Sequence, residues 1–203
     1  MIPGMTDDRI DAVILAGGTA ERLGGASKAD LLLSGRRLLD LVLGSIRELR
    51  AERDGRDVVV APASVETPTL RTMEDPPGSG PLAGIGAGLE LLPHDAGLVL
   101  VCAVDSPGIG AWAPALLQAM EAGTDADGAI VLGGEPEPFR QYLQGIYRRR
   151  SLAAALEAAG SLDNRSVRGV LGRLRLIDVP VDAGACRDLD TPEDLARWRS
   201  CFA

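Results

Sequence analysis

Apolar and polar positions along the chain follow two patterns, short apolar runs and longer amphipathic stretches. The runs at 11–17, 57–61 and 97–104 are mostly apolar at successive positions, which is typical of strands buried on both faces of a sheet. The stretch 82–92 instead repeats Leu and Ile at spacings of three and four residues, which predicts a helix. The same criteria predict further strands at 69–74, 128–133, 139–147 and 176–181, and further helices at 36–53, 111–122, 152–159, 166–174 and 192–201.

This alternation of strands and helices predicts the fold class. Strand–helix–strand units connect by right-handed crossovers and build a mostly parallel sheet with helices on both faces. No linker or repeat interrupts the pattern, so we expect residues 1–203 to form a single doubly wound, Rossmann-like α/β domain, with 1–10 as a loose N-terminal segment. Ligands of such sheets bind at the carboxyl ends of the strands. The loops that follow Leu15, Val60, Glu74 and Val104 are therefore the candidates for function.

Composition excludes several classes of protein. The 203 residues carry a net charge of −8, and neither half of the chain is basic, so we expect no nucleic-acid partner. The longest apolar run, 96–104, is about half of what a membrane span needs, and the N-terminus lacks the features of a signal peptide. Three widely spaced cysteines form neither a disulfide framework nor a metal-binding pattern. A soluble cytoplasmic protein without a membrane partner is expected.

The first loop, 15–28, combines glycines with positive charge. Four glycines allow backbone N–H groups to approach an anion, and Arg22 and Lys28 add fixed charge. Lys28 is the only lysine among 21 basic residues, which favours a specific role. The loop matches neither a Walker A motif nor the G-x-G-x-x-G dinucleotide fingerprint. The alternative is a flexible connection with solvated charges, although long loops in compact domains are usually functional.

Acidic residues follow two other elements. Asp105 directly follows the run 97–104, where its carboxylate could meet nucleotide phosphates or simply cap a Ser-Pro turn. Asp188 and Asp190 are two residues apart, so in extended chain they face the same side. Thr191 has the features of a helix N-cap, which leaves Asp190 free for another task. Two carboxylates together with triphosphate oxygens would form the oxygen-rich site that Mg²⁺ prefers.

The segment after Asp75 begins with Pro-Pro-Gly and leads into the helix expected at 82–92. Ala83, Gly84, Ala87 and Gly88 form a stripe of small residues on this helix, which we expect opposite its apolar face. Such a stripe allows close approach of a ligand or of another backbone segment. Close packing of the helix against the sheet explains the stripe equally well.

These motifs resemble those of the molybdenum cofactor guanylyltransferase family. The matching segments are Leu15-Ala-Gly-Gly, Arg22-Leu-Gly, Lys28 and, after Asp75, Gly80-Pro-Leu-Ala-Gly, and the resemblance extends from about residue 11 to 198. It implies the NTP-transferase fold, binding of GTP and Mg²⁺, and transfer of GMP to the phosphate of molybdenum-bound molybdopterin with release of pyrophosphate. It also implies transient contact with molybdoenzymes or cofactor-insertion proteins.

The resemblance, together with the arguments above, gives each candidate residue a role. Catalytic roles are expected for Arg22, Lys28 and Asp105, and metal binding for Asp105 and Asp190. Nucleotide contacts are expected from Leu15, Ala16, Gly17, Gly18, Lys28, Asp75, Gly80, Pro81, Leu82, Ala83 and Asp105. Acceptor contacts are expected from Gln141, Arg165 and Asp188, with a plain surface role as the alternative for Arg165.

The chain departs from the family pattern at three positions. Many members have Asn at the positions of Ala61, Asp188 and Asp190. The alternatives are a molybdopterin cytidylyltransferase, a guanylyltransferase of another phosphorylated small molecule, or a non-catalytic nucleotide-binding module. The Leu15-Ala-Gly-Gly motif favours the guanylyl over the cytidylyl branch, and retention of both basic residues with Asp105 and Asp190 disfavours a non-catalytic module. An NAD-dependent oxidoreductase would share the fold but lacks its fingerprint.

Overall fold

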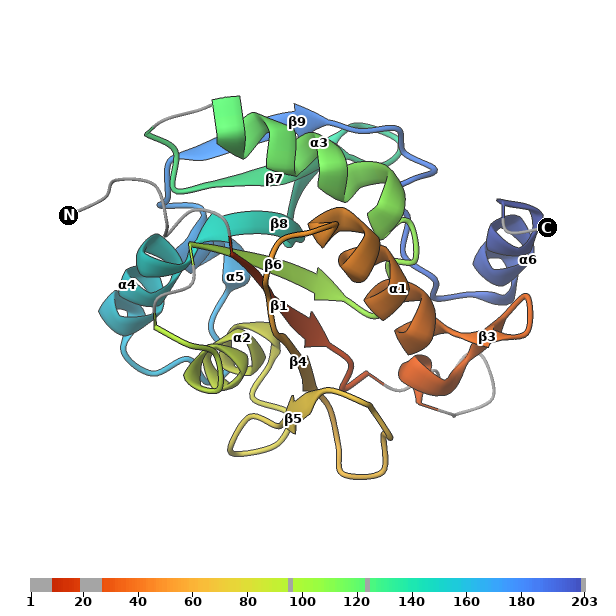
Figure 1. The fold of residues 1–203 in the computed structure, drawn as a ribbon, viewed down its shortest axis with the longest axis horizontal. Helices are drawn as coiled ribbons and strands as arrows, with labels where there is room; N and C mark the ends of the chain where they lie inside the picture. The colour runs from red at the N-terminus through yellow and green to blue at the C-terminus, as the bar shows by residue number, and fades with distance from the viewer. Residues whose placement is uncertain (1–8, 19–26, 95–96, 123–124, 202–203) are drawn as a thin grey trace.

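The computed structural model describes residues 9–18, 27–94, 97–122 and 125–201, which fold around one seven-stranded sheet (Figure 1). In chain order its strands are β1 (Ile10–Leu15), β4 (Asp57–Val60), β5 (Leu70–Thr72), β6 (Leu98–Ala103), β7 (Gly128–Gly133), β8 (Phe139–Arg148) and β9 (Leu176–Pro180). Their spatial order is β5-β4-β1-β6-β8-β7-β9. All neighbouring pairs are parallel except β6–β8 and β7–β8, because β8 runs antiparallel to both of its neighbours. The prediction of a mostly parallel α/β sheet is confirmed.

Helices cover both faces of the sheet (Figure 1). One face packs against α1 (Leu38–Arg50) and α3 (Ile109–Ala122), and Trp198 of α6 (Pro192–Cys201), a helix to one side of the sheet, joins the same apolar layer. The other packs against α2 (Pro81–Glu90), α4 (Arg149–Ala159) and α5 (Val167–Leu171). Along β1, Ala12 and Ile14 point into the first layer and Val13 into the second, so the strand is buried on both sides, as its apolar run predicts. None of the described helices is both long and apolar enough to cross a membrane.

Several element boundaries differ from those expected. β2 (Leu32–Leu33) and β3 (Arg36–Arg37) form a short hairpin. β3 occupies the first two positions of the helix expected at 36–53. That helix, α1, ends at Arg50 because Ala51 adopts a left-handed φ of 51°. The expected loose segment 1–10 overlaps β1 at Ile10, which is buried, whereas residues 1–8 lie outside the described part of the chain.

Strand β8 is irregular where it passes the end of β6. Its pairing with β7 shifts from Ile130–Gly145 to Val131–Gln141, so three extra residues, 142–144, lie between successive pairs. Such irregularities bend a strand and redirect its side chains. The pairing with β6 ends at Gln144, and the preceding part of β8 therefore extends beyond the carboxyl end of β6.

Candidate active site

The first loop leaves β1 at the centre of the sheet. The Ala16 backbone N–H donates to the carbonyl of Val60 at 2.8 Å, so the chain still runs beside β4. Gly17 and Gly18 are exposed, and the N–H of Lys28 donates to the Gly18 carbonyl at 3.3 Å. Lys28 begins the short 3-10 helix η2 (Lys28–Asp30), and its side-chain stem lies over Gly18. Arg22, expected to be catalytic, lies outside the described residues.

The ammonium group of Lys28 lies between two carboxylates. Its Nζ donates to Asp105 Oδ2 and to Asp190 Oδ1, each at 2.5 Å. Burial by itself would lower the pKa of Lys28, but the hydrogen bonds to both carboxylates outweigh it and raise the pKa. The lysine is therefore fully charged at neutral pH. The structure thus brings together three residues that are distant in the sequence and that were singled out separately.

Asp105 and Asp190 are held by backbone contacts around them. The Val104 N–H donates to the Leu15 carbonyl at 2.9 Å, which fixes the start of the turn after β6. The Asp105 carbonyl accepts a 2.7 Å hydrogen bond from Leu189 N–H, and this bond ties the segment before α6 to the same turn. Asp190 does not cap α6, because Thr191 and Asp194 exchange hydrogen bonds in a capping box, as expected.

Asp188 lies close to this cluster, and the residue is exposed to solvent. Partial desolvation of its carboxyl, together with the negative charges of Asp105 and Asp190, raises its pKa to about 7, although Lys28 and Gln144 act in the opposite direction. Gln144 is 3% exposed, and its amide donates to the Cys186 carbonyl at 2.8 Å and to Asp188 at 3.5 Å. The amide therefore links β8 to the acidic segment.

A cavity of about 350 Å³ opens at the carboxyl ends of the four parallel strands β5, β4, β1 and β6. Of the expected nucleotide-binding residues, it is lined by Leu15, Gly17, Gly18, Lys28, Gly80, Pro81 and Asp105. Ala16 and Leu82 are buried beneath it. Asp75 and Ala83 instead line an adjoining cavity of about 410 Å³. Glu74, which precedes Asp75, lines both cavities, so it reaches the glycine-lined cavity where Asp75 does not.

The small-residue stripe of α2 does not form one surface. Gly84 and Gly88 are buried against the sheet, and a Cβ on Gly88 would lie 2.6 Å from Val13 Cγ1. Ala83 and Ala87 face the 410 Å³ cavity. The expectation that the stripe lies opposite the apolar face of the helix is therefore wrong for the two glycines, which allow α2 to approach β1 closely.

A second and larger cavity of about 880 Å³ adjoins the first. It is lined by Gln141 and Asp188, two of the three expected acceptor-binding residues, and by Arg168 of α5. The two cavities share Ala103, Asp105 and Leu143 in their walls, so they meet beside the carboxylate that binds Lys28.

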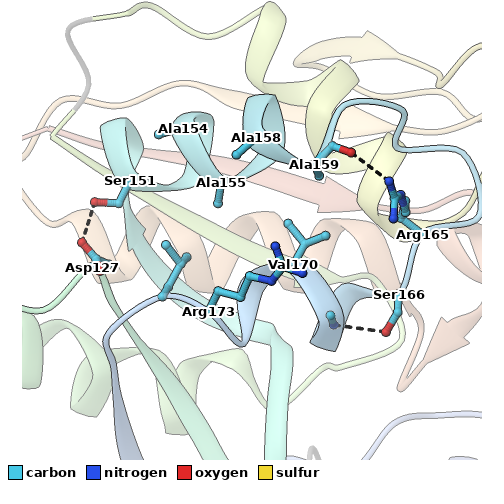
Figure 2. Close-up of a pocket in the computed structure, with 12 residues that line it drawn as sticks. Asp127, Ser151, Ala154, Ala155, Ala158, Ala159, Arg165, Ser166, Val170 and Arg173 are labelled. Carbon is cyan, nitrogen blue, oxygen red and sulfur yellow. Dashed lines mark hydrogen bonds between the residues drawn. The ribbon is translucent and has the colours of Figure 1, made fainter.

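Arg165, the third expected acceptor residue, lies elsewhere. Figure 2 shows it at the end of α4, on the wall of a cavity of about 590 Å³ between α4 and α5. Its guanidinium donates to the carbonyls of Ala159 and Ser161 at 3.1 Å each. Basic side chains at such positions stabilise the unpaired carbonyls of a helix C-terminus. Arg168, three residues later, faces the 880 Å³ cavity instead. Its side chain makes no hydrogen bond to another residue in the described part of the chain.

The fold and site define an enzyme of the nucleotidyltransferase class: a glycine loop, a lysine and an aspartate meet at the strand ends of a doubly wound sheet. Residues 12–178 match the family described as MobA-like NTP transferase domain. The chain belongs to this family.

Similar proteins agree with this assignment. The chain is 35% identical over 198 residues to a molybdenum cofactor guanylyltransferase of Cereibacter sphaeroides, covering 95% of this chain and 96% of that one. It is 32% identical to one of Pseudomonas aeruginosa, covering 92% and 93%. A solved structure of molybdopterin-guanine dinucleotide biosynthesis protein A from Archaeoglobus fulgidus has a TM-score of 0.67 at 22% identity, covering 95% and 98%. A 4-diphosphocytidyl-2C-methyl-D-erythritol synthase from Anaerococcus prevotii has a TM-score of 0.72 at 12% identity, covering 97% and 99%, which shows the shared fold.

Nucleotidyltransferases generally use a divalent metal, and the acidic residues here fit one. One oxygen of Asp105 and one of Asp190 converge on a single cation, the Lys28 ammonium. Among the described residues, no group of three or more His, Cys, Asp or Glu side chains is arranged to hold a metal ion. Mg²⁺ usually takes one or two protein carboxylates and completes its shell with water and substrate phosphates. Asp105 and Asp190 are that kind of donor set.

Proposed function

We propose that the chain acts as a single nucleotidyltransferase domain that transfers GMP from GTP to the phosphate of molybdenum-bound molybdopterin and releases pyrophosphate. The observation that supports this most is the position of Lys28 and Asp105 at the junction of two cavities. The glycine-lined cavity would hold the nucleotide, and the larger cavity would hold the acceptor. An enzyme that joins two substrates needs such adjoining sites, whereas a nucleotide sensor needs only one.

The chemistry proposed requires no general base. A phosphate monoester has a second pKa near 6, so the attacking acceptor oxygen is already ionised at pH 7. The main requirements are to hold two anionic substrates in line and to neutralise the charge that develops on the leaving pyrophosphate. Lys28 would supply positive charge to the triphosphate, as would Arg22. Mg²⁺, held by Asp105 and Asp190 with the triphosphate, would add charge neutralisation when bound.

The walls of the larger cavity offer polar groups to an acceptor. Ser106 and Gln144 each have one buried oxygen without a hydrogen-bond partner within the part of the chain that the structure describes. Buried polar atoms are rarely left unpaired unless a ligand or water completes them. These atoms lie in the wall that also contains Asp105, where the acceptor phosphate would have to approach the nucleotide.

The test is incubation of the purified protein with each of the four NTPs, Mg²⁺ and molybdenum-loaded molybdopterin, with pyrophosphate release as the readout. We expect release with GTP that depends on the acceptor. Preference for CTP would assign the chain to cytidylyl transfer. Binding of GTP without any release on addition of the acceptor would contradict the proposed acceptor and favour a different phosphorylated one. Mn²⁺ in place of Mg²⁺ tests the identity of the metal.

A further inference from the structure

The 880 Å³ cavity has two chemically different ends. Asp105, Ser106 and Asp188 lie at one end, next to Lys28. Phe139 and Arg140, at the start of β8, form the other end. The bend of β8 at 142–144 separates these groups and lets the start of the strand extend beyond β6. The cavity therefore has carboxylates where the reaction would occur, and an aromatic ring and a guanidinium at a distance from it.

Phe139 is unusual for this protein. Its side chain is 52% exposed in a chain that has only two phenylalanines and 3% aromatic residues. Among the other aromatic residues in the described part of the chain, Trp112, Tyr147 and Trp198 are buried, and the first two are among the largest fully buried side chains. An aromatic ring left half in solvent stabilises the fold less than a fully buried ring would. A role in contact with a ligand explains its position better than stability does.

The ring of Phe139 is also held in place. It rests against Gly134, where a Cβ would lie 2.4 Å from the Phe139 Cε1 atom. Gly134 has a φ of 111°, which L side chains rarely adopt, so the turn between β7 and β8 favours glycine for two reasons. Gly133 pairs with Phe139 across the two strands and fixes its backbone. The ring is therefore supported on its Gly134 side and remains open elsewhere to the cavity.

We propose that Phe139 is a positioning residue that stacks on a planar heteroaromatic ring of the acceptor. This inference rests on the proposed function, since it assumes that the larger cavity binds the acceptor. The reacting phosphate must lie near Lys28 and Asp105, so the rest of the acceptor extends toward Phe139. Aromatic faces bind planar rings by stacking with little dependence on the exact ring. A pterin is a ring of this kind.

The neighbouring Arg140 is not available for the same task. Its guanidinium donates twice to Asp178 on β9, through Nε at 3.0 Å and Nη2 at 2.9 Å. This pair fixes Arg140 toward β9. Among the described residues that line the cavity, the aromatic ones are Phe139 and Tyr142. The Tyr142 carbonyl accepts a hydrogen bond from Tyr147, which holds that backbone within the bend.

The experiment uses the full chain and a fluorescent free pterin as the probe, titrated with and without GTP. Phe139→Leu keeps an apolar side chain but removes the aromatic face, and Phe139→Trp keeps one. We expect Phe139→Leu to weaken pterin binding about tenfold, the scale of one lost stacking contact. Phe139→Trp should retain binding. In the transfer assay Phe139→Leu should raise the acceptor KM by a similar factor and leave kcat at saturating acceptor unchanged.

A matched control is Leu91→Ala, another exposed large apolar residue, 42% exposed, that lines none of the cavities described above. It should change neither pterin binding nor KM. Wild-type protein that does not bind the pterin, or Phe139→Leu that binds it as wild type does, would overturn the stacking proposal. GTP binding and pyrophosphate release from wild type are scored separately. The proposed function can therefore fail while stacking holds, or the reverse.

Discussion

Lys28 Nζ lies 2.5 Å from Asp105 Oδ2 although 77 residues separate them in the chain. The contact joins the glycine loop after β1 to the turn after β6, the two central parallel strands. Asp190 binds the same ammonium from the segment before α6. A lysine in this position can reach both the glycine-lined cavity and the two carboxylates, so its charge is available to either.

Replacing Lys28 tests its proposed catalytic role. We expect Lys28→Ala to lower turnover by about 10²–10³, the usual cost of losing one group that stabilises developing charge. Folding should be retained, because Lys28 is the first residue of the short helix η2 and its partners remain partly solvated. Steady-state pyrophosphate release and thermal melting measure the two effects. A collapse of the melting temperature with unchanged activity per folded molecule would show that Lys28 is structural.

Substitution of the carboxylates tests the metal site. Asp105→Asn should raise the Mg²⁺ concentration needed for half-maximal turnover more than Asp190→Asn does. Asp105 is 17% exposed and fixed by the turn, whereas Asp190 is 50% exposed, and an amide oxygen can still act as a neutral ligand there. Mg²⁺ titrations of pyrophosphate release compare the variants. If Asp105→Asn keeps both the wild-type midpoint and rate, Asp105 is only a turn residue.

Metal binding in the absence of nucleotide gives a separate readout. Without phosphates, two carboxylates shared with a lysine are a poor Mg²⁺ site, so wild type should bind little metal. Lys28→Ala removes the competing ammonium, and we expect it to bind Mn²⁺ more tightly than wild type in an EPR titration of the free protein. The double variant Lys28→Ala with Asp105→Asn is the control and should lose that gain. Equal Mn²⁺ binding by wild type and Lys28→Ala would contradict the shared site.

The sequence predicted the sheet and the loops at its carboxyl edge because long apolar runs and glycine-rich connections have few other structural explanations. Lys28 stood out because it is the only lysine, and Asp105 because it directly follows the apolar run 97–104. Phe139 could not be found in this way, since its role depends on the bend in β8, and a register shift leaves no periodic signal. The β2–β3 hairpin is likewise too short, with two residues in each strand, to produce a recognisable pattern.

The directions of individual side chains could not be predicted from the sequence. Glu74 and Asp75 are adjacent carboxylates after one strand, and only the structure shows that Glu74 reaches the glycine-lined cavity whereas Asp75 does not. Arg165 and Arg168 differ by less than one helical turn and still line different cavities. Spacing along the sequence identifies a loop, but the backbone path within it decides which residue points into the site.

The glycines of α2 allow a paired test of helix packing. Gly88→Ala should lower the free energy of unfolding by about 1–3 kcal/mol, because the added Cβ would lie 2.6 Å from Val13 Cγ1 in the core. Gly44→Ala in α1 is the matched change, since its Cβ would meet only Arg36 Nη2 at 3.5 Å. That variant should be stabilised by up to about 1 kcal/mol through helix propensity. Denaturant unfolding measures both. The same sign for the two variants would contradict the packing role.

The ion pair between Asp127 and Arg175 predicts a pH dependence of stability. Burial acts to raise the pKa of Asp127, but hydrogen bonds from the side chain and backbone of Arg175 and from Ser151 outweigh it and lower the pKa to about 2. Figure 2 shows the hydrogen bond between Ser151 and Asp127. In the unfolded chain the carboxyl titrates near its ordinary value of about 3.9. Because the folded pKa is the lower one, the stabilisation is complete above about pH 4 and is lost as the pH falls toward 2.

Asp127→Asn should therefore destabilise the protein at pH 7 by about 1–2 kcal/mol, the usual cost of losing hydrogen bonds to a charged group. The difference from wild type should shrink steadily between pH 4 and pH 2, where the wild-type carboxylate also becomes protonated. Thermal melts at pH 7, 4 and 2.5 follow this convergence. Asp125→Asn, an exposed neighbour that makes no hydrogen bond to Arg175, is the control and should change stability little at any of these pH values. A wild-type advantage that persists undiminished at pH 2.5 would show that the contribution of Asp127 does not depend on its ionisation.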